Sequence, residues 1–502
     1  NTAKMEVSPE TKLSKQLAFS YQSFSSPQVE DGLSSNDLVK KHGERKSVNI
    51  LFSQSAGCCC ICLLLASING VLVSDHERCT ALGQRVLQDG GSSVDAAVAG
   101  ALCLGVVHPH VSGVGGGGVM LVHDIHKNQT RVINFQGTAP KTFRKEMLHN
   151  VSGLKAGLQV GVPGMLKGLQ HAHSLYVFWS NIQTISFFSL KSIILPENDK
   201  PGFHLSSSIA DAISKVEGEQ LSQRFRDIFI PEGRALQAGS YVRIPGLAGV
   251  LEAGLSNFYY GNLSQEIEDE VRANGGVLSR DDISNYSVES VTFVLDYIIQ
   301  VPPPPSAGAA LISALNILSE NNITENKTHP WIAEVPDCKI SVYYHLSLNR
   351  PFGSRIITRS GIILNSLLLD YLWSNKTQRH ADSEERPLLL LMPTIMVPAG
   401  RKCGIYTALS SSGGQNVLHT ITQTICVLKV LTSALLLDKE KKDSLILGGV
   451  QPQPNRLLVD SASPEESVQF IHAEGHVVQR GKTNSAVQGI QRRENIIKVI
   501  KV

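Results

Sequence analysis

A long uncharged apolar segment lies near the beginning of the chain. Residues 50–73 read ILFSQSAGCCCICLLLASINGVLV and contain no charged side chain. The segment is long enough for one membrane-spanning helix. Scattered polar residues inside the segment leave a buried core helix as the alternative. Basic residues precede it closely, namely Lys40, Lys41, Arg45 and Lys46. The positive-inside rule then predicts a single-pass type II membrane protein, with the rest of the chain extracellular or luminal.

Residues 1–49 form a Ser-rich stretch without apolar periodicity. A segment of this kind cannot bury enough apolar surface to offset its ordering entropy, so we expect a disordered cytosolic tail. A cleaved signal peptide fits less well, because almost fifty residues precede the apolar segment.

The pattern changes to helical and then to strand periodicity after the apolar segment. Residues 75–89 predict a helix that Gly90 and Gly91 end. Ser92 or Ser93 can cap the next helix, whose sequence VDAAVAGALCLGVV is apolar on all sides and therefore predicts a buried helix. The segments VMLVHDI and RVINF that follow are typical of neighbouring strands.

The glycine run at residues 115–118 invites comparison with a phosphate-binding loop. The run follows a helix and enters a strand, whereas nucleotide loops follow a strand and open a helix, and no Gly-Lys-Ser/Thr is present. This order argues against a nucleotide site. The nearby His108-Pro109-His110 offers two histidines without an evident third ligand, which favours a structural role over metal binding.

Composition places the chain among globular proteins. It has 502 residues, of which 42% are hydrophobic and 18% charged, and its formal net charge is +2. This balance predicts no attraction to nucleic acid. The nine cysteines show neither paired zinc-type spacing nor an even disulfide framework, and their pairing stays open.

Asn-X-Ser/Thr sequons all follow the apolar segment, as expected if this part of the chain is exposed to glycosylation. The predicted glycosylation sites are Asn128, Asn150, Asn262, Asn285, Asn322, Asn326 and Asn375.

Ordered motifs between residues 75 and 479 resemble the gamma-glutamyltransferases, also called glutathione hydrolases. The strongest motif is GGSSVDAAVAGALCLGVVHPHVSGVGGGG; others are VGVPGMLKGLQHAH, GFHLSSSIADAI, VPPPPSAGAALISALNIL, LNRPFGSRIITRSGIILNS and SSSGGQNV. The type-seven members of the family look most similar.

The resemblance implies an α+β fold of the N-terminal-nucleophile hydrolases, four αββα layers with two stacked antiparallel sheets between helical layers. It implies a large-subunit region at 74–335 and a small-subunit region at 336–502, which form a heterodimer if the precursor cleaves itself. A threonine at the new N-terminus would attack the gamma-glutamyl amide of glutathione and pass the glutamyl group to water, an amino acid or a peptide. No cofactor or metal is expected.

Several positions match the family's site. The pair Gly413-Gly414 matches the oxyanion hole, where glycine lets backbone N–H groups approach closely. Asn349 matches the asparagine that binds the glutamyl moiety, and Asp370 matches the aspartate that pairs with the substrate's α-amino group. Without the resemblance, Asp370 would be taken for a surface or capping residue, and the glycine pair for a turn.

Other positions depart from the family. The loop NFQGTAP has Gln136 and Gly137 where the family has arginine and glutamate, and a glutamine cannot supply a charged bidentate fork to the substrate's α-carboxylate. Leu389 and Leu390 replace paired serines that hold the same carboxylate, and Leu367 replaces a polar residue near Asp370. These changes predict a weakened pocket for a free α-carboxylate.

The candidate nucleophile is Thr328, and two alignments compete for it. In the first, Thr328-His329 matches the family's Thr-Thr-His stretch. In the second, the segment HPWIAE matches a large-subunit helix, and a stretch containing the nucleophile is missing before Asn349. The second alignment is favoured, because the interval from Pro305 to Asn349 is far shorter than in the family. A catalytically inactive membrane glycoprotein is therefore the alternative function.

Overall fold

The computed structural model divides the chain into two units, Asn1–Ile68 and Asn69–Val502, and every residue it describes belongs to the second. The described residues are 70–148, 154–176, 202–293, 299–303, 305–320, 340–372, 386–387, 391–397, 405–412, 417–418, 421–422, 424–425, 450–453, 456–460, 465, 469, 472, 477–481, 486–493 and 496–501.

Several predictions fall outside these residues and stay predictions. They concern the tail at 1–49, most of the apolar segment at 50–73, Thr328, Gly413, Gly414, Leu389, Leu390, Asn150, Asn322, Asn326 and Asn375. Among the helices that the structure describes, none combines the length and the apolar character needed to cross a membrane.

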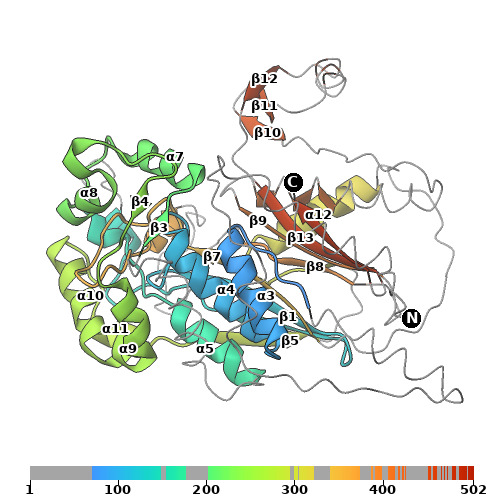
Figure 1. Cartoon of the computed structure of the whole chain (residues 1–502), viewed down its shortest axis with the longest axis horizontal. Helices are drawn as coiled ribbons and strands as arrows, with labels where there is room; N and C mark the ends of the chain where they lie inside the picture. The colour runs from blue at the N-terminus through green and yellow to red at the C-terminus, as the bar shows by residue number, and fades with distance from the viewer. Residues whose placement is uncertain are drawn as a thin grey trace, which may run out of the picture. The chain divides into compact units, whose positions relative to one another are not determined.

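Two helices open the described unit as the sequence predicts (Figure 1). Helix α3, Glu77–Gln88, packs beside α4, Ser93–Val107. Ser92 caps α4 through a reciprocal capping box with Asp95, which satisfies two backbone N–H groups that would otherwise lack partners. Nearly all of α4 is buried, and a disulfide joins Cys79 on α3 to Cys103 on α4.

A four-stranded antiparallel sheet follows, in the order β5-β2-β1-β7. Its strands are β1 Gly117–Asp124, β2 Gln129–Asn134, β5 Glu289–Phe293 and β7 Ile340–Ser347. Strands β1 and β2 confirm the two strands predicted after the glycine run. β7 pairs with β1 on one side, and no described strand pairs with its other edge.

The glycine run owes its composition to this sheet. A Cβ at Gly115 would collide with the carbonyl oxygen of Ile363, and one at Gly118 with the carbonyl oxygen of His345. Backbone from the later part of the chain therefore occupies the space that side chains would need. The run has a packing role, in line with the argument against a nucleotide site.

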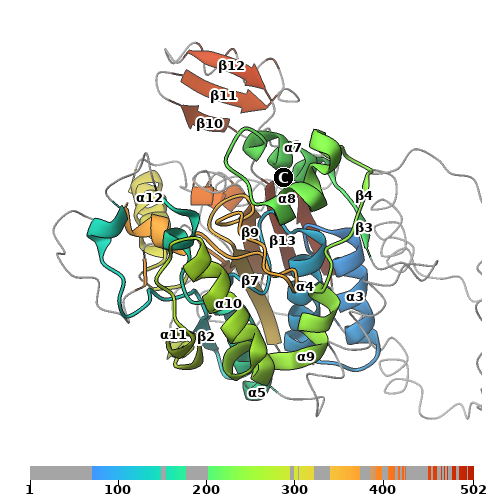
Figure 2. The same ribbon diagram turned by 90° about the vertical axis from the view of Figure 1, so that its left-hand side faces the viewer.

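A second antiparallel sheet has the order β14-β13-β9-β8-β6 (Figures 1 and 2). Its strands are β6 Ile299–Gln300, β8 Thr394–Met396, β9 Ile405–Ser412, β13 Ala486–Arg493 and β14 Ile496–Lys501. A short sheet pairs β3 Phe203–His204 with β4 Tyr241–Val242. Another has the order β10 Val450–Gln453, β11 Arg456–Asp460 and β12 Val478–Gly481, in which β12 runs parallel to β11.

The remaining helices connect or cover these sheets. They are α5 Met165–Leu175, α7 Ser207–Val216, α8 Gln223–Phe229, α9 Leu247–Tyr260, α10 Asn262–Ala273, α11 Arg280–Ser284 and α12 Gly308–Glu320. Short 3-10 turns are η3 Lys145–Leu148, η5 Ala156–Gln159, η6 Pro231–Gly233 and η7 Leu367–Leu372.

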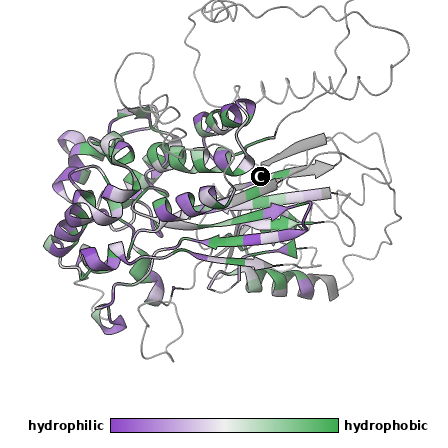
Figure 3. Ribbon diagram, turned by 90° about the horizontal axis from the view of Figure 1, so that it is seen from below, coloured by the Kyte–Doolittle hydropathy of each residue, from purple (hydrophilic) through white to green (hydrophobic). Residues whose placement is uncertain are grey.

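Alternate side chains of a strand point to opposite faces of its sheet, and this determines which layer each face contacts. Met120 and Val122 of β1 enter the largest core cluster with α3, α4 and α5, whereas Val119 and Leu121 pack with Ile395 of the second sheet. The outer face of the second sheet is covered by α12 in a third cluster. Two antiparallel sheets therefore face each other with helices outside, and Figure 3 shows the apolar segments along strands and covering helices in green.

Candidate active site

Asn349 and Asp370, two residues that the resemblance assigns to glutamyl binding, lie together in the structure. Asn349 comes shortly after the end of β7, and Asp370 lies in η7. The Asn349 Nδ2 donates a hydrogen bond to Asp370 Oδ2 over 2.8 Å. Both side chains are partly exposed, so the pair is accessible to a ligand while held in one geometry.

The environment of Asp370 changes its acidity. Burial raises the pKa of this carboxyl from 3.8 to about 6, while the hydrogen bond from Asn349 and the positive charge of Arg350 act in the opposite direction. A carboxylate that is costly to ionise gains more from a cation than one in water does. The site is therefore suited to an ammonium group, which would restore the ordinary ionised state.

The backbone after β7 is strained in a way that fixes Asn349. Its φ is 73°, and Phe352 and Arg355 also have left-handed φ values of 57° and 62°. Such conformations cost of order 1–3 kcal/mol each and persist where the surroundings enforce them. The loop is therefore held by its packing rather than by its intrinsic preference.

Phe352 supplies much of that packing. Its side chain is fully buried, with ring centroids 5.1 Å from Phe225, 4.9 Å from Phe229 and 6.2 Å from His110. Its N–H donates to the carbonyl oxygen of His110 over 2.8 Å. An aromatic anchor three residues after Asn349 thus positions the loop that carries the site.

Asn365 and Ser366 hold the segment before η7 in place. The Asn365 amide donates to the carbonyl oxygens of Gly115 and Gly161 and accepts from the N–H of Gly161. The Ser366 N–H donates to the carbonyl oxygen of Leu348, the residue before Asn349. The segment that carries Asn349 is therefore hydrogen-bonded to the segment that leads into η7 and Asp370.

Gln136 follows β2 in a loop whose backbone is held tightly. Its carbonyl oxygen accepts hydrogen bonds from the Tyr286 hydroxyl, 2.7 Å away, and from Arg386 Nη1, 3.2 Å away. Arg386 also donates to the carbonyl oxygens of Asn134 and Ser287. The Gln136 side chain is only 2% exposed, and neither atom of its amide has a hydrogen-bond partner.

The departures at Gly137 and Leu367 are in direct contact. A Cβ on Gly137 would lie 2.9 Å from Leu367 Cδ2 and would collide with the carbonyl oxygen of Val162. A larger side chain at 137 could not coexist with this backbone and with leucine at 367. The apolar replacement near Asp370 and the loss of a side chain in the Gln136 loop are thus parts of one packing arrangement.

Three predicted glycosylation sites fall on described residues, and all are exposed. They are Asn128 in the turn between β1 and β2, Asn262 at the start of α10 and Asn285 at the end of α11. The Asn285 Nδ2 donates to the carbonyl oxygen of Asp281 over 2.8 Å, a bond that a glycan would have to rearrange.

Sequence reasoning did not identify Tyr286 or Arg386. Both contact the Gln136 loop from positions at least 150 residues away along the chain. The only sequence signal was an arginine, Arg386, next to an apolar run. An arginine in such a neighbourhood could have suggested a buried side chain that holds carbonyl groups, but the sequence does not show which carbonyl groups.

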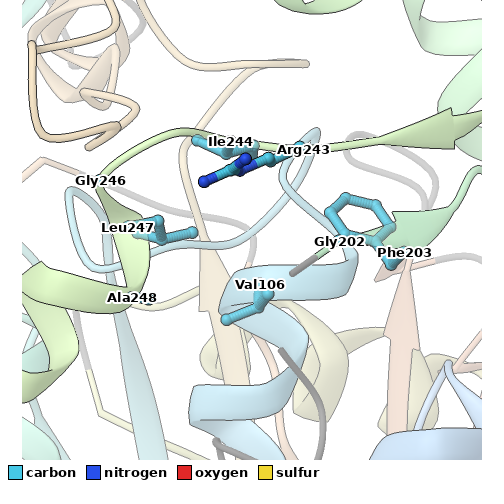
Figure 4. Close-up of a pocket in the computed structure, with 8 residues that line it drawn as sticks. All are labelled: Val106, Gly202, Phe203, Arg243, Ile244, Gly246, Leu247 and Ala248. Atoms are coloured by element: carbon cyan, nitrogen blue, oxygen red, sulfur yellow. The ribbon is translucent and has the colours of Figure 1, made fainter. Parts of the chain in front are cut away.

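Other candidate features involve residues outside the pair. The ring of His108 lies edge to face with the rings of His76 and His110, and each pair of ring centroids is 5.3 Å apart. Within the described part of the chain, no group of three ligands could hold a metal ion. A small pocket of about 60 Å³, with Arg243 and Phe203 on its lining, contains none of the predicted site residues (Figure 4).

Comparison with known proteins gives the family. The model of the family described as Gamma-glutamyltranspeptidase matches residues 79–336 and 339–501. Glutathione hydrolase 7 of Homo sapiens is 37% identical over 526 aligned residues, covering 86% of this chain and 77% of that protein. Glutathione hydrolase 7 of Bos taurus is 38% identical with the same coverage.

The solved structures give the fold. The crystal structure of cephalosporin acylase from Bacillus halodurans aligns with a TM-score of 0.64 at 18% identity, covering 84% of this chain and 91% of that one. At this identity the likeness concerns the fold alone. The predicted N-terminal-nucleophile hydrolase fold, with helices and antiparallel sheets, is confirmed.

Proposed function

The chain belongs to the gamma-glutamyltranspeptidase family, and we propose that it binds gamma-glutamyl compounds such as glutathione and cleaves their gamma-glutamyl amide. The glutamyl group would pass to water, an amino acid or a peptide. The observation that carries this proposal is the 2.8 Å contact between Asn349 and Asp370, two positions chosen from the sequence for glutamyl binding.

Each proposed role follows from the chemistry of the residue. The Asp370 carboxylate would hold the α-ammonium group of the glutamyl moiety. Asn349 uses its Nδ2 to orient Asp370, which leaves its carbonyl oxygen free to accept a hydrogen bond from the ligand. The backbone N–H groups of Gly413 and Gly414 would stabilise the oxyanion.

The bond changes would proceed in two steps. The hydroxyl oxygen of a threonine attacks the γ-carbonyl carbon, its proton passes to the departing amine, and the amide C–N bond breaks. Water or an amine acceptor then attacks the resulting ester and regenerates the hydroxyl. Thr328 is the candidate for this hydroxyl, and self-cleavage before it would create the large and small subunits.

A second function, binding without cleavage, is favoured by a specific observation. The family match is interrupted between residues 336 and 339, and Thr328 lies inside the first matched segment and not at the start of the second. The alignment with Glutathione hydrolase 7 spans 526 residues, more than the 502 of this chain, so that relative carries residues absent here. The outer edge of β7, without a described partner strand, fits a missing neighbour.

We propose that the protein is a single-pass type II membrane glycoprotein, with the described unit extracellular or luminal. Three observations support this: the uncharged segment at 50–73, the exposed sequons at Asn128, Asn262 and Asn285, and the Cys79–Cys103 disulfide. Disulfides persist mainly in oxidising compartments. Detection of the N-terminal tail outside intact cells would contradict this topology.

Mass spectrometry of the purified protein, combined with a chromogenic assay, separates the two functions. An active protein should yield a fragment with Thr328 at its N-terminus and release 4-nitroaniline from the gamma-(4-nitroanilide) of glutamic acid. An uncut chain that binds this compound but releases nothing supports binding without cleavage. Absence of binding, with the Asp370→Ala variant as the matched baseline, would refute both.

A further inference from the structure

The Gln136 amide is a buried polar group without a partner. Its side chain is 2% exposed, and both Oε1 and Nε2 lack hydrogen bonds within the described part of the chain. Buried polar atoms are nearly always paired, and exceptions tend to mark places where a ligand or another group completes the bonding. This amide therefore needs a partner that offers both a donor and an acceptor.

The surrounding backbone prevents the loop from resolving this by moving. The Tyr286 hydroxyl and the Arg386 guanidinium both hold the Gln136 carbonyl oxygen, and the Gln136 N–H donates to Asn134 Oδ1. Arg386 is itself buried and pairs with Glu289 at 3.3 Å. The main chain of Gln136 is thus fully bonded, and only the side-chain amide remains unpaired.

This amide lies in the same part of the fold as the Asn349–Asp370 pair. Gly137, the next residue, packs against Leu367, which begins the turn that carries Asp370. Leu367 is buried and offers no polar atom to the amide. A ligand whose ammonium group meets Asp370 carries its α-carboxyl group on the same carbon, so this carboxyl is the polar group of the ligand closest to the Asn349–Asp370 pair.

The chemistry of an amide selects its partner. A carboxylate has only acceptor atoms, so it could bond Nε2 but would place a negative oxygen against Oε1. A primary carboxamide presents an N–H and a C=O side by side, and it can pair with both atoms at once. Neutral partners are therefore favoured over anions here.

From this geometry we infer that Gln136 selects gamma-glutamyl compounds whose α-carboxyl group is neutral, in the form of a primary amide. The inference rests on the proposed binding of the glutamyl ammonium group at Asp370. It assigns to Gln136 a specificity role in this chain: the amide recognises an amide, and a free α-carboxylate is disfavoured.

Calorimetric titration of the purified full-length chain tests this without requiring cleavage. The probes are the gamma-(4-nitroanilide) of L-glutamic acid and the same compound with its α-carboxyl as a primary amide. The α-amide should bind about 10- to 150-fold more tightly, the range expected for one charge-dependent hydrogen-bonding contact. Gln136→Arg should reverse the preference, and Gln136→Met, which keeps the length but removes the amide, should abolish it.

The outcomes are distinguishable. Equal affinities, a wild-type preference for the free carboxylate, or a preference unchanged in Gln136→Met would each overturn the role of Gln136 and leave the proposed function intact. If neither probe binds the wild type, glutamyl recognition at Asp370 fails, and the inference fails with it. Melting temperatures identify variants that do not fold, and the wild-type comparison decides the question without them.

Discussion

Replacing Asp370 by asparagine should stabilise the protein while weakening its site. The pKa of Asp370 is about 6 in the folded protein and 3.8 for the ordinary carboxyl, because burial opposes ionisation. The folded state thus binds a proton more readily than the unfolded chain does. The contribution of this group to stability is fully present below pH 3.8 and is lost as the pH rises through 6.

The size of the effect follows from these two values. A difference between 3.8 and about 6 corresponds to about 3 kcal/mol, since one pKa unit equals about 1.4 kcal/mol. Partial exposure of Asp370 allows solvent screening, so we expect about 1–2 kcal/mol. An asparagine carries no charge, and its carbonyl oxygen can still accept from Asn349 Nδ2.

Urea unfolding of the wild type and Asp370→Asn at pH 4 and pH 7 measures this. The variant should gain about 1–2 kcal/mol in the free energy of unfolding at pH 7 relative to its difference at pH 4. Asp227→Asn, on the exposed surface of α8, is the matched control. A stability difference that is the same at both pH values would refute the reasoning.

Three further changes test the support of the site. Phe352→Ala should lower the free energy of unfolding by about 3–5 kcal/mol and Phe352→Leu by much less, measured by urea unfolding; equal losses would contradict an anchoring ring. Replacing Cys79 and Cys103 by serine should cost about 3 kcal/mol for a loop of 24 residues, and a wild-type melting temperature insensitive to reductant would contradict the disulfide. Burial lowers the pKa of His110 to about 4, so the contribution of this residue to stability falls as the pH drops below 6.5. The variant His110→Phe should reduce the loss in the free energy of unfolding between pH 6.5 and pH 4 by up to about 3 kcal/mol. An unchanged pH dependence of the unfolding free energy would count against this.

The first helices and strands could be predicted because their signals are local. Ser92, Asp95 and the glycines at 90 and 91 act within one helical turn, and the apolar run of β1 occupies the consecutive residues Val119–Val122. The structure confirms these elements to within two residues at their ends. Hydrogen bonds between sequence neighbours depend little on the rest of the fold.

The site was predictable only in part. Asn349 and Asp370 were identified by resemblance, and their contact across 21 residues depends on β7 and η7 being brought together. Neither the disulfide partner of Cys79 nor the role of Phe352 follows from spacing. A buried ring can anchor a strained loop only through neighbours such as Phe225, which lies more than a hundred residues away along the chain.

By itself the sequence determined the family, the helix and strand pattern near the beginning of the described unit, and the residue types at the proposed glutamyl-binding positions. Only the tertiary structure decided what the departures mean. Gln136 could be read from the sequence as a lost positive charge, whereas the fold adds that Tyr286 and Arg386 hold its backbone and that its amide is buried without a partner. Such a state arises from contacts between distant segments, and a sequence pattern records the residues but not the groups that surround them.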